Sequence, residues 1–205
     1  INFFLYFIIS VFTLNSKLLL FSVSISILSR LYLSSSSTLV NVIEKYTKAL
    51  DLLDNYDHQC LIKPKGKETI YELTYSDCRA IIDSMKFKNT SSVFGVEKEN
   101  GKLEGILAAV YQNVFGQEVY PSLEEKAAHL LYCIVKDHPF IDGCKRIAAT
   151  LFLEFLNRNH ALIKNGKIII SNDTLVAITV LTAESNPEEK EVIIKLIMNF
   201  LSKGI

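Results

Sequence analysis

Several common functional elements are missing from this sequence, and each absence argues against a class of protein. Lysine plus arginine balances aspartate plus glutamate at 22 each, and no basic stripe is visible, so the charge pattern does not indicate nucleic-acid binding. Neither a Walker-type loop nor a G-x-G-x-x-G loop occurs, which argues against the commonest nucleotide-binding folds. Metal-ligand spacing is absent among His58, His129 and His160.

Cysteine is also scarce, with four residues in the chain and no C-x-x-C pair. Two of them fall in or beside helices that we expect to be buried. This usage indicates reduced thiols in a cytoplasmic protein rather than a disulfide framework or a zinc site. The cysteines are Cys60, Cys78, Cys133 and Cys144.

Charge is nearly absent from residues 1–33, where Lys17 and Arg30 are the exceptions. Lys17 interrupts the apolar run before it reaches the roughly 20 residues that a membrane-spanning helix needs. A signal peptide should open with a basic region, which is missing here. The pattern favours a buried or partner-covered segment over a membrane anchor, and we treat residues 1–37, which end in a serine linker, as a first region of unknown role.

Residues 38–90 predict a small helical and α/β appendage. An amphipathic helix should begin it, a strand should follow over Thr69–Leu73, and a second helix should run from Thr74 to Met85, with Asp77 completing a capping box. We expect this appendage to pack on the third region and to shape its entrance. The apolar residues of the first helix are Leu39, Val40, Ile43, Tyr46, Leu50 and Leu53.

The third region, residues 91–205, contains two strongly periodic helices joined by a short loop. Ser122 should cap the first, with Glu125 in the capping-box position, and that helix should run to about Lys136. The second should run from about Cys144 to Arg158. Unpaired N–H groups at its start form an anion site before any side chain is counted.

The loop between these helices, His138–Arg146, combines groups suited to reaction at a nucleotide phosphate. The imidazole of His138 can accept a proton near neutral pH, and the carboxylate of Asp142 can hold a divalent cation. Lys145 and Arg146 place positive charge at a helix N-terminus, where it opposes the helix dipole, which favours a bound anion. A solvated helix start is the alternative for these two cations.

This helix-loop-helix resembles the Fic/Doc (Fido) family, whose core motif has the form H-[P/x]-F-x-[D/E]-G-N-[G/K]-R. The likeness extends over about Phe94–Phe200. Residues 101–109 and 118–128 are similar to the stretch before the motif in the death-on-curing (Doc) branch. The resemblance to this family implies a mainly α fold, which is a helical bundle with a small β-hairpin flap.

The resemblance also implies roles for the loop. His138 would be the general base for a protein hydroxyl, Phe140 would anchor the loop in the core, and Asp142 would hold Mg2+ against the phosphates of ATP. The remaining contacts with the nucleotide would come from the start of the second helix. These residues are Gly143, Cys144, Lys145 and Arg146.

Three positions depart from the usual pattern of AMP-transferring members. Cys144 replaces an asparagine, and losing one donor of this kind costs about 100 to 1000 fold in rate. Lys145 replaces a glycine, as in the Doc branch, and Ala149 replaces an arginine that grips the terminal phosphate. A Cys–His hydrolase centred on Cys144 is disfavoured, because only His138 offers a partner.

The resemblance implies partners as well. Val93–Leu103, with a turn at Asn100–Gly101, is similar to the family's flap, which holds a target peptide by strand addition; a plain surface hairpin fits the pattern equally well. The inhibitory motif [S/T]-x-x-x-E-[G/N] is absent, so we expect any restraint to come from a separate antitoxin-like protein or from the N-terminal segment.

A hairpin and two further helices are predicted for the rest of the chain. Asn165–Gly166 predicts a second hairpin, followed by a helix over 172–184 and a last helix after Ser185.

The function expected is transfer of AMP from ATP to a hydroxyl of a target protein. Doc-like protein phosphorylation and a catalytically weakened scaffold are the alternatives.

Overall fold

The structure is a computed structural model that describes residues 44 and 46–203 of the 205-residue chain. The chain divides into two compact units, Ile1–Asn55 and Tyr56–Ile205. In the first, residues 46–55 are helical, and three apolar side chains of the predicted amphipathic helix, Tyr46, Leu50 and Leu53, are exposed. Over the described residues, no helix is long and apolar enough to cross a membrane. The predictions for residues 1–37 lie outside them.

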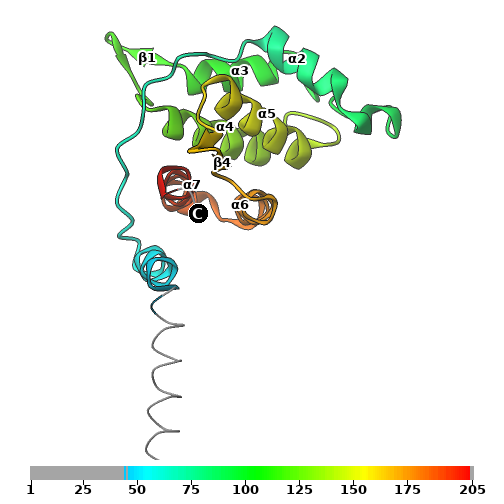
Figure 1. The fold of residues 1–205 in the computed structure, drawn as a ribbon. Helices are drawn as coiled ribbons and strands as arrows, with labels where there is room; N and C mark the ends of the chain where they lie inside the picture. Colours follow the sequence, from blue (N-terminus) through cyan, green and yellow to red (C-terminus); the bar gives the residue numbers. More distant parts are fainter. Residues whose placement is uncertain (1–43, 45, 204–205) are drawn as a thin grey trace, which may run out of the picture. The chain divides into compact units, whose positions relative to one another are not determined.

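The second unit is mainly helical, as the sequence predicts, with two short antiparallel hairpins (Figure 1). Its α-helices are α2 (Tyr75–Ser84), α3 (Lys102–Val110), α4 (Leu123–Asp137), α5 (Cys144–Arg158), α6 (Asn172–Glu184) and α7 (Lys190–Lys203). Two 3₁₀ turns are η1 (Lys86–Asn89) and η2 (Pro187–Glu189). The hairpins are β1 (Asn113–Val114) with β2 (Gln117–Glu118), and β3 (Ile163–Lys164) with β4 (Lys167–Ile168).

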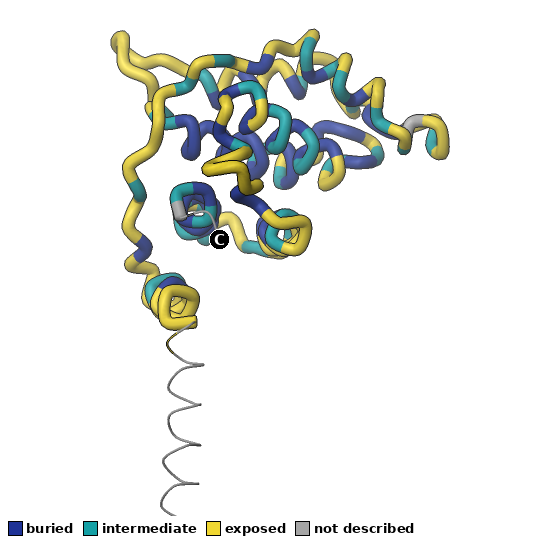
Figure 2. The backbone as a smooth tube through the Cα atoms, viewed as in Figure 1, coloured by how far each residue is buried: buried dark blue, intermediate teal, exposed yellow. Residues whose placement is uncertain are grey.

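Helix α4 is the centre of this unit, because it packs against α3, α5, α6 and α7. Its apolar stripe is buried, and so are several of its polar side chains, which makes it a dark band in Figure 2. Ser122 caps the helix by accepting a hydrogen bond from the N–H of Glu125, as predicted. The reverse bond of a full capping box is not recorded there. Because α4 is buried on most sides, the loop that begins at its C-terminal end starts from a fixed position.

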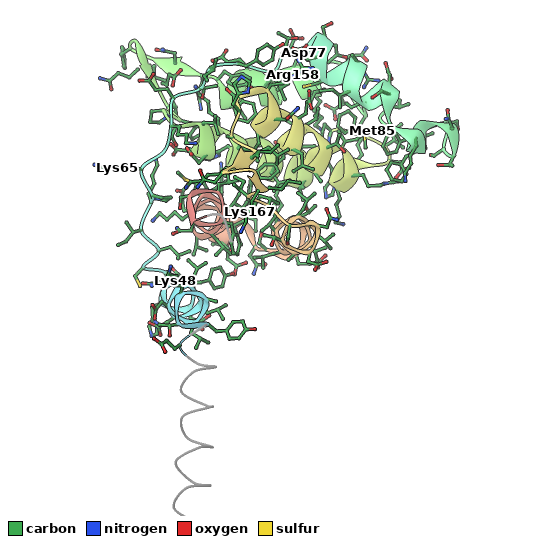
Figure 3. All side chains as sticks on the ribbon, in the orientation of Figure 1. Lys48, Lys65, Asp77, Met85, Arg158 and Lys167 are labelled. Atoms are coloured by element: carbon green, nitrogen blue, oxygen red, sulfur yellow. The ribbon has the colours of Figure 1, made fainter. Side chains whose placement is uncertain are left out.

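Helix α2 also begins as the sequence predicts, with a complete capping box between Thr74 and Asp77. Arg158, at the end of α5, donates to the Asp77 carboxylate at 2.9 Å, and the two residues are labelled close together in Figure 3. Hydrogen bonds from Thr74 are the main reason that the pKa of Asp77 lies below its ordinary value, with Arg158 contributing. This polar contact fastens α2 to the end of α5.

The predicted strand over Thr69–Leu73 is wrong, because that segment is extended but pairs with no neighbouring strand in the described chain. Side chains satisfy its backbone instead. The N–H groups of Ile70 and Tyr71 both donate to the side-chain oxygen of Asn159 at 2.8 Å, and the N–H of Leu73 donates to the Tyr111 hydroxyl at 3.0 Å. The segment therefore lies along the helices and not in a sheet.

Both hairpins turn through residues with positive φ. The predicted turn at Asn165–Gly166 is confirmed, with φ of 52° and 73°. The β1–β2 hairpin was not predicted, and it turns through Phe115 and Gly116. Lys126 of α4 is almost fully buried and bonds to Glu118 of β2 at 2.9 Å, which ties this hairpin to the central helix.

Buried His129 on α4 should make stability depend on pH. Its ring stacks on Tyr120 at 3.7 Å, its Nδ1 has no hydrogen-bond partner in the described structure, and burial lowers its pKa from 6.5 to about 4. The positive charges of Lys190 and Lys63 act in the same direction. The unfolded chain therefore binds a proton between these pKa values that the folded chain does not, so stability is lost as pH falls below 6.5.

Urea unfolding at pH 7.5 and pH 5 tests this effect. We expect His129 to contribute a loss of about 2 kcal/mol in unfolding free energy between those two conditions. The variant His129→Phe keeps the aromatic stack but cannot titrate, so it should lose less stability on acidification than the wild type. An identical pH dependence in the two proteins would show that His129 is not the titrating group.

Candidate active site

The loop between α4 and α5 is shaped by backbone conformations that few residues adopt. His138 ends α4 with φ of 45°, in the left-handed region, and Pro139 cannot continue the helix. Gly143 then starts α5 with φ of 94°, and its carbonyl accepts the first helical hydrogen bond, from Ile147 at 2.8 Å. The chain therefore leaves one buried helix and enters another within a few residues.

A glycine is required at position 143 for a second reason. A Cβ placed there would lie 2.4 Å from the ring of Phe94, which is itself buried. Phe140 is also buried, as predicted, and holds the middle of the loop in the core. Two phenylalanine rings from distant parts of the sequence thus fix the loop, and the second of them, Phe94, leaves no room for a side chain at 143.

The segment before α3 fixes the loop from its other side. The N–H of Gly95 donates to the Asp142 carbonyl at 3.1 Å, that of Ile141 to the Val96 carbonyl at 2.9 Å, and that of Lys98 to the Pro139 carbonyl at 2.8 Å. Two isolated β-bridges accompany these bonds. We refer to residues 94–98 as the loop-pairing segment.

This pairing corrects the prediction of a flap hairpin over Val93–Leu103. No hairpin forms there, since Asn100–Gly101 turns directly into α3, with Gly101 at its N-cap and φ of 82°. The hydrogen bonds that a hairpin would have made within 93–103 are made instead with the motif loop. Sequence pattern alone could not identify that distant partner.

The loop encloses one side of an open pocket of about 300 Å³. All of the residues predicted for the site line it, together with Phe140 and Ile141 of the same loop and one residue from outside the loop, Lys98 of the loop-pairing segment. The fold therefore brings the predicted residues together, although their chemical roles remain predictions. The predicted lining residues are His138, Asp142, Gly143, Cys144, Lys145 and Arg146.

Arg146 is already paired within this pocket. Its guanidinium donates to Asp142 at 2.9 Å and lies over two aromatic rings, 4.7 Å from the centre of Phe87 and 4.9 Å from that of Phe94. Both charged side chains are partly exposed, so the pair is weakened by solvent. An entering anion could therefore draw Arg146 away from Asp142 at modest cost.

Cys144 makes a local contact and does not present its thiol as a free donor. Its Sγ donates to the carbonyl of Phe140 at 3.3 Å, four residues earlier in the loop. Gly143 supplies no side-chain cap to the first turn of α5. The backbone N–H groups at that end are therefore the pocket's uncharged donors for an anion.

The residues present fit a magnesium ion that arrives with a nucleotide. Mg²⁺ is commonly held by one or two carboxylates together with substrate phosphates and water. Asp142 supplies one carboxylate to the pocket, and only its Oδ1 is recorded in the bond to Arg146. Across the described residues, no three histidine, cysteine or acidic side chains are grouped closely enough to hold a metal ion by themselves.

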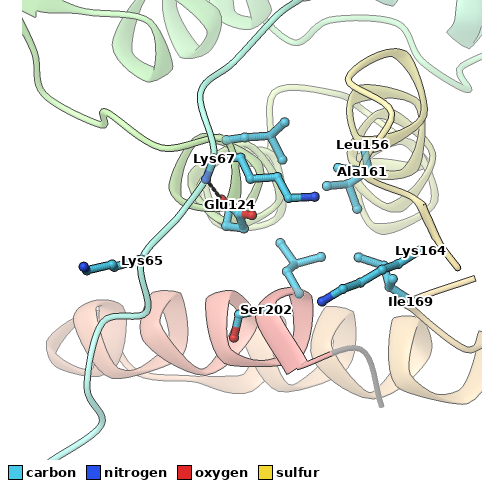
Figure 4. Close-up of a pocket in the computed structure, with 10 residues that line it drawn as sticks. Lys65, Lys67, Glu124, Leu156, Ala161, Lys164, Ile169 and Ser202 are labelled. Carbon is cyan, nitrogen blue, oxygen red and sulfur yellow. Dashed lines mark hydrogen bonds between the residues drawn. The ribbon is translucent and has the colours of Figure 1, made fainter.

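A second pocket of about 200 Å³ lies at the opposite ends of α4 and α5 (Figure 4). Leu123 and Glu124 line it from the start of α4 and Leu156 from near the end of α5, with Lys67 and Lys164 at its edges. None of the motif residues contributes to it. The proton acceptor, the carboxylate and the cations suited to phosphate chemistry are gathered at the motif loop, which is the candidate active site.

The second unit is thus a helical domain with a short, tightly fixed loop between two buried helices, and comparison with known proteins shows which family it resembles. Residues 72–156 match the model of the Fic/DOC family. That part of the chain, which includes α2 to α5 up to Leu156, is a Fic/Doc (Fido) domain.

A curated relative is the protein named Toxin Doc from Mycolicibacterium smegmatis. It is 36% identical over 72 residues, which is 34% of this chain and 55% of the relative. The match thus spans about half of the relative's length. A search of solved structures gave no match.

Proposed function

We propose that this protein transfers AMP from ATP to a hydroxyl side chain of a target protein. The observation that carries the proposal is the single pocket in which His138, Asp142 and the start of α5 meet. A proton acceptor, a carboxylate suited to Mg²⁺ and an anion-binding helix end are the parts that such a transfer needs. The family of residues 72–156 agrees with phosphate-group transfer in general.

In the proposed reaction, His138 accepts the proton of the target hydroxyl as its oxygen forms a bond to the α-phosphorus of ATP. The bond to pyrophosphate breaks, and pyrophosphate leaves. N–H groups at the start of α5 and Arg146 stabilise the negative charge on the phosphates. Mg²⁺, held by Asp142, would supply further neutralisation of that charge.

Doc-like phosphorylation of a protein is the second candidate. It is favoured by the relative that carries the name Toxin Doc and by Lys145, which occupies a position where AMP-transferring members usually have glycine. In that reaction the γ-phosphorus of ATP would be attacked. A third candidate, a scaffold with little catalysis, is motivated by Cys144, whose thiol is bonded to Phe140.

Incubation with Mg-ATP and a cell lysate, followed by mass spectrometry of the lysate proteins, separates these three candidates. Transfer of AMP adds the mass of AMP to a serine, threonine or tyrosine, whereas phosphorylation adds the mass of phosphate. If neither mass appears beyond the background of lysate without the protein, both enzymatic candidates are contradicted.

Replacing Cys144 by asparagine should raise activity. An amide donor at the start of α5 would restore a hydrogen bond to phosphate, and the loss of one such donor costs about 100 to 1000 fold, so we expect a gain of up to about 100 fold. Cys144→Ser is the control, because it removes the thiol but keeps a small polar side chain at the same position. Cys133→Asn would not serve as a control, because Cys133 packs against the core. An unchanged rate in Cys144→Asn would show that the thiol is not the limiting feature.

We also propose that a separate antitoxin-like protein restrains the activity. The name of the relative, Toxin Doc, and the lack of the family's inhibitory motif in this sequence support this view. A cytoplasmic location is part of the same proposal, because the reaction uses ATP.

A further inference from the structure

The backbone of Lys98 is held against the residue that follows His138, the proposed proton acceptor for the target hydroxyl. Its N–H donates to the Pro139 carbonyl at 2.8 Å, and Pro139 directly follows His138. Lys98 lines the same pocket as His138. The loop-pairing segment bonds to residues 139, 141 and 142 of the loop and carries Lys98 on the half that contains His138.

The charge of Lys98 is not neutralised by its neighbours in sequence. Glu97 is engaged elsewhere, since its carboxylate accepts hydrogen bonds from the Tyr75 hydroxyl at 2.8 Å and from the N–H of Leu103 at 3.2 Å. Glu99 pairs with Lys102 at 3.3 Å. The structure records no ion pair for Lys98 over its described residues.

The other cations of the pocket come from a different element of the fold, α5. Lys145 and Arg146 belong to the first turn of α5, together with the N–H groups that suit phosphates. The one carboxylate of the lining, Asp142, is bonded to Arg146. Phosphate binding therefore has its own positive groups, and Lys98 is an additional cation on the segment that pairs with the loop next to His138.

We propose that Lys98 selects targets in which an acidic residue lies next to the modified hydroxyl. This inference rests on the proposed transfer to a protein hydroxyl and adds the class of acceptor. Lys98 pairs with the target's carboxylate while His138 faces the hydroxyl. Because Lys98 is exposed, its effect is that of a surface ion pair, about a two- to fivefold preference.

The test is a charge reversal, Lys98→Glu, compared with the wild type on the same lysate with Mg-ATP. Modified sites are mapped by mass spectrometry, and the residues flanking each site are compared with those around all serines, threonines and tyrosines of the same proteins. The control is Lys164→Glu, the same change on an exposed lysine of β3 that lines the other pocket.

Wild type and Lys164→Glu should modify sites enriched in flanking aspartate or glutamate, and Lys98→Glu should lose that enrichment or prefer flanking lysine or arginine. Modification without acidic enrichment in the wild type would overturn the role of Lys98 and leave the transfer reaction standing. A uniform loss of rate in Lys98→Glu, with site preference unchanged, would also overturn it, because Lys98 would then serve the phosphates. No modification by any of the proteins would contradict the proposed function itself.

Discussion

Replacing His138 by asparagine should lower the rate of protein modification by about 100 to 10,000 fold, the usual contribution of a general base. Asparagine is chosen because it tolerates the left-handed backbone of this position, where φ is 45°. The fold should therefore survive while the proton acceptor is lost. The measurement is the initial rate of label transfer from ATP to target proteins.

His160 provides the matched control for this change. It is exposed, it also has positive φ, at 53°, and it does not line the motif pocket. His160→Asn should keep the wild-type rate. If His138→Asn keeps that rate as well, His138 is not the base, and the chemistry assigned to the loop is wrong.

Replacing Gly143 by alanine should destabilise the domain by about 2 to 5 kcal/mol. A left-handed backbone costs a residue with a Cβ about 1 to 2 kcal/mol, and crowding in a packed core costs about 1 to 3 kcal/mol more. The crowding arises because the added Cβ would lie 2.4 Å from the Phe94 ring. Urea unfolding of variant and wild type gives the difference in free energy.

Gly166→Ala separates the two contributions. Gly166 has a similar positive φ, at 73°, but nothing lies within 4 Å of the position of its Cβ. It should therefore show only the backbone cost. Equal losses of stability in Gly143→Ala and Gly166→Ala would contradict the close packing of Phe94 against the loop.

Helix positions near the site could be predicted from the sequence because their signals are local. Ser122 and Thr74 each cap the helix that follows by accepting a hydrogen bond from the N–H three residues later, and Pro139 follows the last turn of α4. The predicted start of α5 at Cys144 is likewise confirmed, since Gly143 precedes a regular apolar repeat. The grouping of His138 with Asp142 and Arg146 followed directly from the short loop between two helices.

The remaining parts could not be predicted because their partners are distant in sequence. Ile70 donates to Asn159 across 89 positions, so a segment that reads as a strand finds a side chain instead of a neighbouring strand. Val93–Leu103 reads as a hairpin, but its backbone bonds go to the motif loop. Lys98 enters the pocket only through that pairing, and no local pattern marks it.

The pairing of Asp142 with Arg146 bears on how a nucleotide would enter. Both side chains are needed for the proposed reaction, yet here they bond to each other at 2.9 Å. Phosphates that reach the start of α5 would compete for Arg146 and free the carboxylate for Mg²⁺.

The position of a radioactive label in ATP tests the central claim most directly. ATP labelled at the α-phosphorus or at the γ-phosphorus is incubated with lysate and either wild type or His138→Asn, and the label retained on protein is compared. AMP transfer should leave the α label on protein in a manner that depends on His138. Retention of the γ label alone would contradict AMP transfer in favour of phosphorylation, and no His138-dependent label of either kind would contradict catalysis at this loop.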